Sequence, residues 1–462
     1  MEKIGIVILF IALCFGSCKS VVNQPNALST TVNPIDEPII TEIIEIDSVW
    51  AANGVRFDLK TIGNQQFIVY YDRNRMMTVA SRSLDSKVWT KKTLPNQLIW
   101  DSHNSVKLGI DEMGYIHVSG NQHVDPLAYF RSTKPYDVSS VVEVNRMIGE
   151  DEESVTYPNF FNDKSGSLLF SYRSGTCGNG NILINRYNPQ EGKWERYLDK
   201  PLFEGIEEDD DRAAYHHWVK DSNGNFHFAW MWRWTPMVET SHFICYATTP
   251  DLKNWRNAKG KIVSLPFRPN DADVMVDNTP SKGGLHNSRY KLFLTDNDEP
   301  IIGYIKYDDV GNTQLYLAMF QAGRWISKKI SDWDFRWKFI DGGAFMTIGG
   351  KFRFTGISSD GLLVIDWETE KEESGQYVID LETFDHSNKI ANIKKPYPDS
   401  LNEKISPNPE MNVRLTYDKG GNGEDDAQYV LKWEAEHGGF RQHAPEVIPE
   451  GPLSPLYILK IN

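Results

Sequence analysis

Two histidines stand at the ends of one short segment of the chain, and histidine is well suited to proton transfer near neutral pH. His103 comes shortly before the apolar run Val106–Ile110, and His123 comes shortly after the run Tyr115–Val118. The residues between the two runs, Asp-Glu-Met-Gly, are typical of a tight turn. The pattern predicts an antiparallel hairpin, whose outer ends lie side by side. We therefore expect the two imidazoles to meet and to form a proton-transfer site.

Tyrosine, arginine and further histidines gather in three other segments that resemble strand ends beside loops. Residues 171–181 include a glycine-rich loop, which lets the backbone approach a ligand closely. Residues 214–217 read Ala-Tyr-His-His, and residues 285–290 read Leu-His-Asn-Ser-Arg-Tyr. Besides the two histidines, the candidate site residues are Asn104, Tyr172, Arg173, Arg186, Tyr215, His286 and Arg289.

These residue types favour elimination over hydrolysis, because no obvious pair of carboxylates accompanies them. A glycosidase normally needs two Asp or Glu residues across the bond that it cleaves. A β-eliminating lyase must instead neutralise a uronate carboxylate, remove the adjacent C5 proton and protonate the leaving oxygen. Arginine suits the first task, and neutral histidine suits the second. Tyrosine suits the third, or both proton steps if a neighbouring arginine lowers its pKa.

Each candidate also has a purely structural interpretation. Tyr172 would be a core aromatic residue if its face of the strand is buried, and Arg186 would simply pair with a surface acid. His117 and His227 alternate with apolar neighbours, which is typical of hydrogen-bonded strand positions. The sequence leaves open which candidate is the base and which is the acid.

A recurring unit predicts the fold. Apolar strands flank a tight turn repeatedly, with Gly63, Gly114, Gly166, Gly224, Asp298 and Gly350 as turn markers spaced by 51, 52, 58, 74 and 52 residues. Repeats near 50 residues are typical of propeller blades. We predict an all-β chain whose residues 49–462 form a seven-bladed β-propeller, with six or eight blades as alternatives. The last blade is expected within 411–460, closed by a strand from near residues 49–60.

The N-terminus predicts export. Lys3 precedes the apolar run Ile4–Phe15, which is too short to span a membrane. The sequence Phe-Gly-Ser-Cys that ends at Cys18 resembles a bacterial lipobox. Residues 1–17 are therefore expected to be a lipoprotein signal peptide and Cys18 a lipidated residue, with 18–48 as a tether. The protein would be a monomer anchored to the bacterial outer membrane, facing the periplasm or the surface; an ordinary signal peptide is the alternative.

Charge and motifs limit the partners. The net charge of −14 argues against nucleic acid and against an anionic membrane surface. No P-loop, dinucleotide fingerprint or paired CxxC motif is present, and we expect no required cofactor. A structural zinc or calcium ion is the metal hypothesis, with His242 and Cys245 as a weak ligand pair and the acidic run 207–211 as a lesser calcium candidate. Cys177 and Cys245 could pair, stay free or help to bind a metal.

Several of these motifs resemble the BNR-repeat group that contains the seven-bladed ulvan lyases of polysaccharide lyase families 24 and 25. The similarity covers roughly residues 50–460. It rests on Asp101-x-His-Asn, His123-x-x-Pro-Leu-x-Tyr, Tyr172-Arg-Ser-Gly, His286-Asn-x-Arg-Tyr, Gly311-Asn-Thr-Gln and Arg336-Trp. The resemblance implies endolytic β-elimination of ulvan, an anionic sulfated algal polysaccharide of rhamnose 3-sulfate and uronic acids, to unsaturated uronyl oligosaccharides.

The resemblance also implies roles for individual residues. His103 and His123 match the site histidines of the family, Tyr172 its catalytic tyrosine and Arg186 its carboxylate-neutralising arginine. The remaining candidates would bind substrate: Asn104, Arg173, Tyr215, His286 and Arg289. The structural zinc site of the family is not reproduced, because the chain has no close Cys-x-Cys pair.

Two other functions are alternatives at this point. One is a propeller glycoside hydrolase of the sialidase type, which would need a carboxylate pair or a tyrosine–glutamate pair. The other is a glycan-binding surface lipoprotein without catalysis. The sequence does not distinguish glucuronate from its epimer iduronate as the preferred uronic acid.

Overall fold

The computed structural model describes residues 38–205, 211–338, 349–371, 373–420 and 427–462. The chain divides into two units, 1–36 and 37–462, and the second contains every described residue. Within this part the protein is all-β, because its only helical elements are five short 3-10 turns: η1 (Val138–Ser140), η2 (Val238–Thr240), η3 (Ala272–Val274), η4 (Asp399–Asn402) and η5 (Arg441–His443). The all-β prediction is confirmed. None of the helical elements in these ranges is long and apolar enough to cross a membrane.

Five antiparallel sheets of four strands each follow a common pattern. In sequence order, the first comprises β2 (Asp58–Ile62), β3 (Gln65–Tyr71), β4 (Met76–Ser83) and β5 (Thr90–Gln97), and the second β6 (Val106–Ile110), β7 (Ile116–Gly120), β9 (Tyr129–Ser132) and β10 (Val141–Glu143). Two later ones comprise β21 (Tyr290–Leu294), β22 (Pro300–Tyr307), β23 (Thr313–Gln321) and β24 (Arg324–Lys329), then β25 (Gly350–Ile357), β26 (Leu362–Thr369), β27 (Ser374–Asp380) and β28 (Asp385–His386). The last comprises β29 (Asn412–Tyr417), β30 (Gln428–Ala435), β31 (Leu453–Ile461) and β1 (Ile40–Trp50).

The middle of the chain forms one sheet of eleven strands. Its strands are β8 (His123–Asp125), β11 (Val155–Asn162), β12 (Leu168–Thr176), β13 (Asn179–Asn188), β14 (Lys193–Arg196), β15 (Ala213–Lys220), β16 (Phe226–Arg233), β17 (Ser241–Thr249), β18 (Trp255–Arg256), β19 (Ile262–Val263) and β20 (Met275–Asp277). One parallel pair, Gly180 with Ala213, joins β13 to β15. The sheet thus contains two antiparallel groups whose strand ladders share a single residue pair, although their side chains pack together in one apolar cluster.

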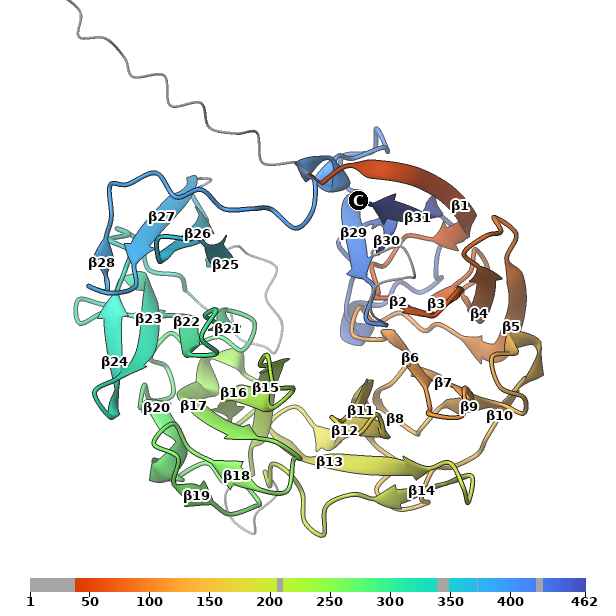
Figure 1. The fold of residues 1–462 in the computed structure, drawn as a ribbon, viewed down its shortest axis with the longest axis horizontal. Coiled ribbons are helices and arrows are strands. Elements are labelled where there is room, and N and C mark those ends of the chain that lie inside the picture. Colours follow the sequence, from red (N-terminus) through yellow and green to blue (C-terminus); the bar gives the residue numbers. More distant parts are fainter. Residues whose placement is uncertain (1–37, 206–210, 339–348, 372, 421–426) are drawn as a thin grey trace, which may run out of the picture. The chain divides into compact units, whose positions relative to one another are not determined.

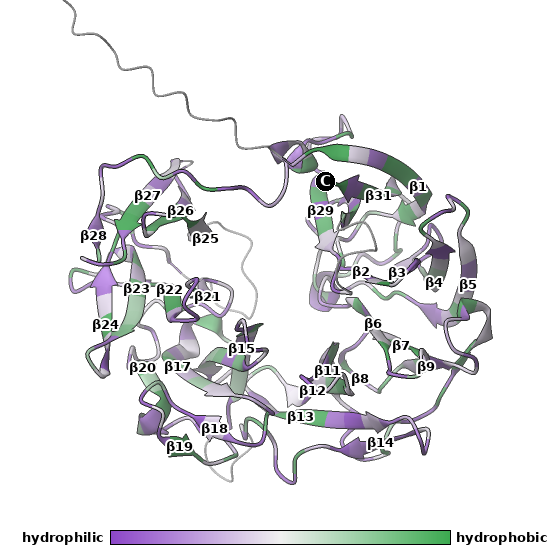
Figure 2. Ribbon diagram, in the orientation of Figure 1, coloured by the Kyte–Doolittle hydropathy of each residue, from purple (hydrophilic) through white to green (hydrophobic). Residues whose placement is uncertain are grey.

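The sheets succeed one another in a propeller-like arrangement. Figure 1 shows the second unit with the first strand of each group, β2, β6, β11, β15, β21 and β25, on the inner side, and β5, β10, β14, β24 and β28 outside. Central strands are continuously buried, as in Phe-His-Phe-Ala-Trp-Met-Trp-Arg of β16. Outer strands such as β5 and β28 are mostly exposed, and the outer strands β14 and β28 are largely hydrophilic in Figure 2. None of the sheets in the described ranges closes on itself.

The predicted turns are confirmed at five of the six marked positions. Gly63, Gly114, Gly166, Gly224 and Asp298 all have positive φ and lie between the first and second strands of their groups. The marker Gly350 is wrong, because it begins β25, and the corresponding turn is residues 358–361 with Gly361 at φ 78°.

The N-terminal boundary of the folded part also differs from the prediction. We expected a tether through residue 48 and a closing strand near residues 49–60. Instead, β1 pairs antiparallel with β31, from Ile40 opposite Ile461 to Trp50 opposite Leu453. Residues 40–48 therefore belong to the folded part and not to the expected tether, and Cys18 lies outside the described residues. The alternating burial of β1, with Ile44 and Ile46 buried and Ile43 exposed, shows that only one face of this strand packs on the core.

We expect the pairing of β1 to stabilise the fold through its buried face. Ile46 is 6% exposed and Ile43 is 59% exposed on the same strand. Ile46→Ala should lower the free energy of unfolding by about 3 kcal/mol, because it removes buried methyl groups and leaves a cavity. Chemical denaturation measures this change. The matched control Ile43→Ala should cost less than about 0.5 kcal/mol, and equal losses in both variants would contradict the packing described here.

Candidate active site

The predicted hairpin brings His103 and His123 together. Strands β6 and β7 pair from Val106 opposite Gly120 to Ile110 opposite Ile116. The histidine rings flank the open end of this hairpin and stack with their centroids 4.1 Å apart. The expected juxtaposition of the two imidazoles is therefore found.

A buried carboxylate holds both rings. Asp101 is 1% exposed; its Oδ1 lies 2.7 Å from Nδ1 of His103, and its Oδ2 lies 2.7 Å from Nδ1 of His123. A carboxylate accepts, so each Nδ1 carries the hydrogen in this arrangement, and each neutral ring keeps its lone pair on Nε2. Asp101 thus orients two potential bases at once.

The charges of this group follow from its burial and hydrogen bonds. Burial alone would raise the pKa of Asp101, but the hydrogen bonds from His103 and His123 hold it well below its usual value. Burial lowers the pKa of His123, with His103 adding to the effect and the hydrogen bond to Asp101 opposing it. His123 is therefore a neutral imidazole near neutral pH, the form that accepts a proton.

Asp101, His103 and His123 also have the composition of a metal-ligand set, because their donor atoms lie within 4.8 Å of one another. However, both Nδ1 atoms lie at hydrogen-bond distance from the carboxylate oxygens. A nitrogen that donates its hydrogen to a carboxylate has no lone pair left for a metal, so each ring could bind an ion only through Nε2. The same Nε2 lone pair is the one that would accept a proton, and the cluster therefore has the geometry for either role.

Tyr157 faces the histidine pair because the backbone of β11 is distorted at this residue. Strand β11 lies between β8 and β12, and Thr156 stands opposite His123 on one side and Arg173 on the other. The register then shifts between Thr156 and Asn159, and Tyr157 has a φ of 56°, in the left-handed region that non-glycine residues rarely adopt. The ring of Tyr157 lies 6.1 Å from each histidine ring. Such strain is often found at functional sites.

Arg173 completes the site as a buried cation. It is 1% exposed, and its guanidinium carbon lies 5.0 Å from the ring centre of Tyr157 and 5.7 Å from that of Tyr215. Its Nη1 donates to the Tyr215 hydroxyl at 3.4 Å, while Nε and Nη2 have no hydrogen-bond partner. Gly180 makes room for this side chain, since a Cβ there would lie 2.8 Å from Cδ of Arg173. The glycine-rich loop therefore accommodates the arginine.

The unpaired donors of Arg173 indicate an anion-binding position. Within the described ranges no carboxylate forms an ion pair with it. A buried charge without a counter-ion is costly, and unsatisfied buried groups often have a functional reason. A bound carboxylate would supply both the missing charge and the missing acceptors, in the bidentate geometry that guanidinium favours.

The tyrosines beside Arg173 keep their protons. Burial raises the pKa of Tyr157, although the positive charge of Arg173 acts in the opposite direction. Tyr157 is densely surrounded but remains 40% exposed, so its side chain is open on one side. The pKa of Tyr215 is likewise raised by burial, and its hydroxyl lies 2.8 Å from Sγ of Cys177. At neutral pH both hydroxyl groups can donate a proton.

Four of the predicted residues, His103, His123, Arg173 and Tyr215, meet in one place. His286 and Arg289 lie beside them. The hydroxyl of Tyr290, the residue after Arg289, donates to the backbone oxygen of Tyr215 at 2.7 Å. The ring of His286 stacks on Trp337 at 5.0 Å, and the guanidinium of Arg289 lies 5.7 Å from the centre of the same ring. Asn104 is buried and donates to Asn121 at 3.1 Å, so it supports the loop that carries the histidines.

Tyr172 and Arg186 do not join this group, which corrects the sequence interpretation. Neighbouring residues of a strand point to opposite faces, so Tyr172 faces away when Arg173 faces the site. Tyr172 packs in the core, and its hydroxyl accepts from Nη1 of Arg196 at 3.2 Å. Arg186 stands opposite Leu169, toward the other end of β12, and forms an ion pair with Glu195. The structure thus places Tyr172 in the core and Arg186 in an exposed ion pair, as their structural interpretations describe.

The proposed metal ligands have other partners. His242 receives a hydrogen bond from Nη1 of Arg212 at Nε2 (2.9 Å) and donates from Nδ1 to the backbone oxygen of Thr240 (2.8 Å). Cys245 is buried in an apolar cluster, where burial raises the pKa of its thiol. Cys177 and Cys245 are both free thiols. Of the acidic run 207–211, residues 207–210 lie outside the described part.

Sequence reasoning missed two residues of the site, Asp101 and Tyr157. Asp101 belongs to the motif Asp101-x-His-Asn, but the sequence alone predicted no function for it. Tyr157 is followed by Pro158 within the strand Val155–Asn162. Because proline cannot donate to a strand ladder and marks edges and bulges, this pair of residues was the signal for a distorted strand.

Comparison with known proteins assigns the family. The profile of the family described as "BNR repeat-containing family member" matches residues 65–333. The chain belongs to this family. Two curated relatives are ulvan lyases of Alteromonas: the short isoform of strain LOR, 25% identical over 170 residues, and a long isoform, 27% identical over 128 residues. The matches cover 32% and 25% of this chain, and the chain spans only 31% and 12% of these two relatives.

Solved structures support the same fold. The polysaccharide lyase Uly1 superposes with a TM-score of 0.59 at 13% identity, covering 91% of this chain and 99% of that protein. A PL25 ulvan lyase superposes with a TM-score of 0.55 at 13% identity, covering 84% of this chain and 92% of its own. The same kind of enzyme is also known with -[GlcA(1-4)Rha3S]- bound, at a TM-score of 0.54 and 13% identity. The resemblance to BNR-type ulvan lyases is confirmed.

We expect Asp101 to tune the titration of His123. Because the hydrogen bond to Asp101 raises the pKa of His123 against the effect of burial, Asp101→Asn should lower that pKa further. NMR titration of the imidazole signals measures the shift. His117, whose carboxylate partner is Asp111, is the internal control and should titrate unchanged. A rise in the pKa of His123, or an equal shift of His117, would contradict the arrangement.

Proposed function

We propose that this protein is a polysaccharide lyase that cleaves ulvan-type polysaccharides, sulfated chains of rhamnose and uronic acids, by endolytic β-elimination. The observation that carries the proposal is Arg173, a buried cation without an acid partner that lies between Tyr157 and Tyr215 and beside His123. The family resemblance supports the proposal: two relatives are ulvan lyases, and one structural neighbour holds a sulfated rhamnose–glucuronate oligosaccharide.

The proposed reaction begins with the uronate carboxylate on the open donors of Arg173. Neutralising this carboxylate acidifies the C5 proton of the same sugar. Nε2 of His123 accepts that proton, and the electron pair of the C5–H bond forms the C4=C5 double bond. The bond between C4 and O4 breaks, and the hydroxyl of Tyr157 protonates the departing oxygen. No water enters the products.

The neighbouring groups stabilise the charges that develop. Asp101 accepts a hydrogen bond from Nδ1 of His123 and therefore stabilises the imidazolium that forms. His103 stacks on His123 and shares the same carboxylate, so it is the second base in reach. Tyr215 positions Arg173 through its hydroxyl. Bases on one side and a tyrosine on the other would suit uronates whose C5 proton lies on either face.

The arrangement disfavours a hydrolase. The two acids near the histidines are already committed, Asp101 to both rings and Asp125 to Arg441, whose Nη1 donates to Oδ1 at 3.0 Å. A glycosidase needs one carboxylic acid and one free carboxylate across the bond. A non-catalytic glycan-binding role stays an outcome of the experiments below.

Three further properties belong to the proposal. We infer seven blades, counting the two antiparallel groups of the eleven-stranded sheet separately, since one residue pair alone joins their strand ladders. We infer a lipid anchor at Cys18 on an exported monomer, on the basis of the lipobox-like sequence. We also infer that the elimination needs no cofactor, because arginine, histidine and tyrosine supply its three tasks; a structural metal ion stays a hypothesis.

Tyr157→Phe should abolish most of the activity. Removing the hydroxyl removes the proposed acid, which should slow the reaction at least about 100-fold. The rate is followed through the ultraviolet absorbance of the unsaturated uronate formed from ulvan. Tyr172→Phe, a tyrosine of the neighbouring strand outside the site, is the matched control and should stay within about twofold of the wild type. Products heavier by one water would identify hydrolysis and refute elimination.

The reaction should require the planar guanidinium group of Arg173 and not only its positive charge. Arg173→Lys keeps a positive charge but loses the bidentate fork, so we expect kcat/KM to fall about 100-fold, whereas Arg186→Lys should have little effect.

With wild-type enzyme, the rate should fall as the pH drops through the lowered pKa of His123, because the protonated ring cannot accept a proton. A rate that rises toward acid pH would exclude His123 as the base.

A further inference from the structure

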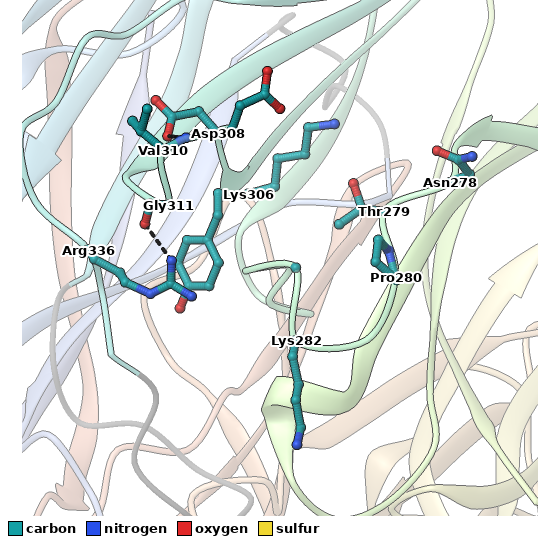
Figure 3. Close-up of a pocket in the computed structure, with 12 residues that line it drawn as sticks. Asn278, Thr279, Pro280, Lys282, Lys306, Asp308, Val310, Gly311 and Arg336 are labelled. Carbon is teal, nitrogen blue, oxygen red and sulfur yellow. Dashed lines mark hydrogen bonds between the residues drawn. The ribbon is translucent and has the colours of Figure 1, made fainter.

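A second cavity lies beside the candidate active site. It has a volume of about 590 Å³ and is lined by the segment 278–283, the turn 306–311 between β22 and β23, and Arg336. We call it the Arg336 pocket. Figure 3 shows Arg336 on one wall, Thr279 and Pro280 on the opposite wall, and Lys282 at one end, away from Asp308.

The pocket and the active site are connected through stacked side chains. Trp337, next to Arg336, carries the ring of His286 at 5.0 Å and the guanidinium of Arg289 at 5.7 Å. Tyr290, which follows Arg289, donates to the backbone of Tyr215 at 2.7 Å. The segment 336–337 thus contributes Arg336 to the pocket and the buried Trp337 to the side chains beside the candidate active site.

Arg336 is held rigidly. Its guanidinium carbon lies 3.9 Å from the ring centre of Tyr307, and Nη1 donates to the backbone oxygen of Gly311 at 2.7 Å. Tyr307 is itself fixed, because its hydroxyl donates to the backbone oxygen of Trp337 at 2.5 Å. Only one of the five guanidinium hydrogens is used in these contacts. The others are available to an oxyanion in a geometry that is already ordered.

Several other charges line the pocket. Nζ of Lys306 pairs with Oδ2 of Asp277 at 2.7 Å. Asp308 lies 3.8 Å from Nζ of Lys329 and accepts hydrogen bonds from the backbone of Asn312 at 2.9 Å and from the side chain of Gln314 at 3.0 Å. Asp309 also lines the pocket. Among the residues that the structure describes, neither Arg336 nor Lys282 forms an ion pair, and Lys282 lies at the end away from Asp308 (Figure 3). These two cations are therefore the ones that an anionic ligand could bind.

We propose that the Arg336 pocket binds a sulfate ester of the polysaccharide at a distance from the cleaved bond; this assignment rests on the proposed lyase function. The uronate at the cleavage point already occupies Arg173, so the pocket takes a different sugar of the same chain. A sulfate ester keeps its charge at all working pH values, and its oxygens can accept from a guanidinium and an ammonium together. Because the whole chain carries a net charge of −14, local cations are needed to hold a polyanion.

Binding measurements on two variants test the pocket. Arg336→Gln and Lys282→Gln are made in the Tyr157→Phe background, so that the ligand stays intact, and calorimetry measures affinity for long ulvan oligosaccharides before and after chemical desulfation. Each variant should bind the sulfated ligand about tenfold more weakly, the loss of one charge-assisted contact. With the desulfated ligand, the variants and the parent should bind equally. Lys282 is exposed, so Lys282→Gln should fold normally even if Arg336→Gln does not.

Arg324→Gln is the matched control. Arg324 is an exposed arginine that begins β24 at the far end of the same sheet, after the turn that follows Gln321. Its substitution should leave both affinities unchanged. Equal binding of sulfated ligand by all variants, or an equal loss with the desulfated ligand, would overturn the assignment. Absence of unsaturated products with wild-type enzyme would refute the lyase function instead, and that outcome is read in a separate assay.

Discussion

The hydrogen bonds of Asp101 to two histidines organise the rest of the site. One buried carboxylate accepts from Nδ1 of both His103 and His123 and thereby fixes their rings and the nitrogen that carries the lone pair. The carboxylate in turn depends on residues far away in the chain. Arg441, from the connection between β30 and β31, binds Asp125 beside it, and Phe440 lies 5.1 Å from the ring of His103. The connection between β30 and β31 therefore supports the candidate site from the last sheet of the chain.

Burial divides the proton-transfer roles in the site. The same desolvation lowers the pKa of His123 and raises that of Tyr157, because burial disfavours the charged form of each group. A neutral base and a protonated acid are thus ready at the same pH without a carboxylate pair. Arg173 is the exception, a charge that stays buried without a partner in the described structure. The rest of the fold must offset the free-energy cost of burying this charge. The proposed anionic substrate would supply the missing counter-charge when it binds.

Cations without an acid partner are found at the surface as well as in the candidate active site. The chain is acidic overall, yet Arg173, Arg336 and Lys282 form no ion pair among the described residues. Aromatic rings hold these cations in place: Tyr157 and Tyr215 flank Arg173, and Tyr307 supports Arg336. A cation stacked on a ring keeps its hydrogen-bond donors at the edge available. An arginine stacked on a tyrosine ring thus occurs both in the candidate active site and in the Arg336 pocket.

The sequence by itself determined the hairpin, the strand-and-turn repeat and the kinds of side chain that the chemistry needs. His103 and His123 meet because a tight turn and two short apolar runs are local signals, and most turn markers are correct for the same reason. Tertiary structure decided which residues of a strand face the site. Tyr172 and Arg173 are adjacent, and alternation says only that they point apart, so the faces could not be assigned until β11 and β15 were packed against β12 and β13. Tyr157 enters the site through a shift of register and a positive φ. Such a distortion is stabilised by contacts between distant segments, and for that physical reason it is not determined by the local sequence.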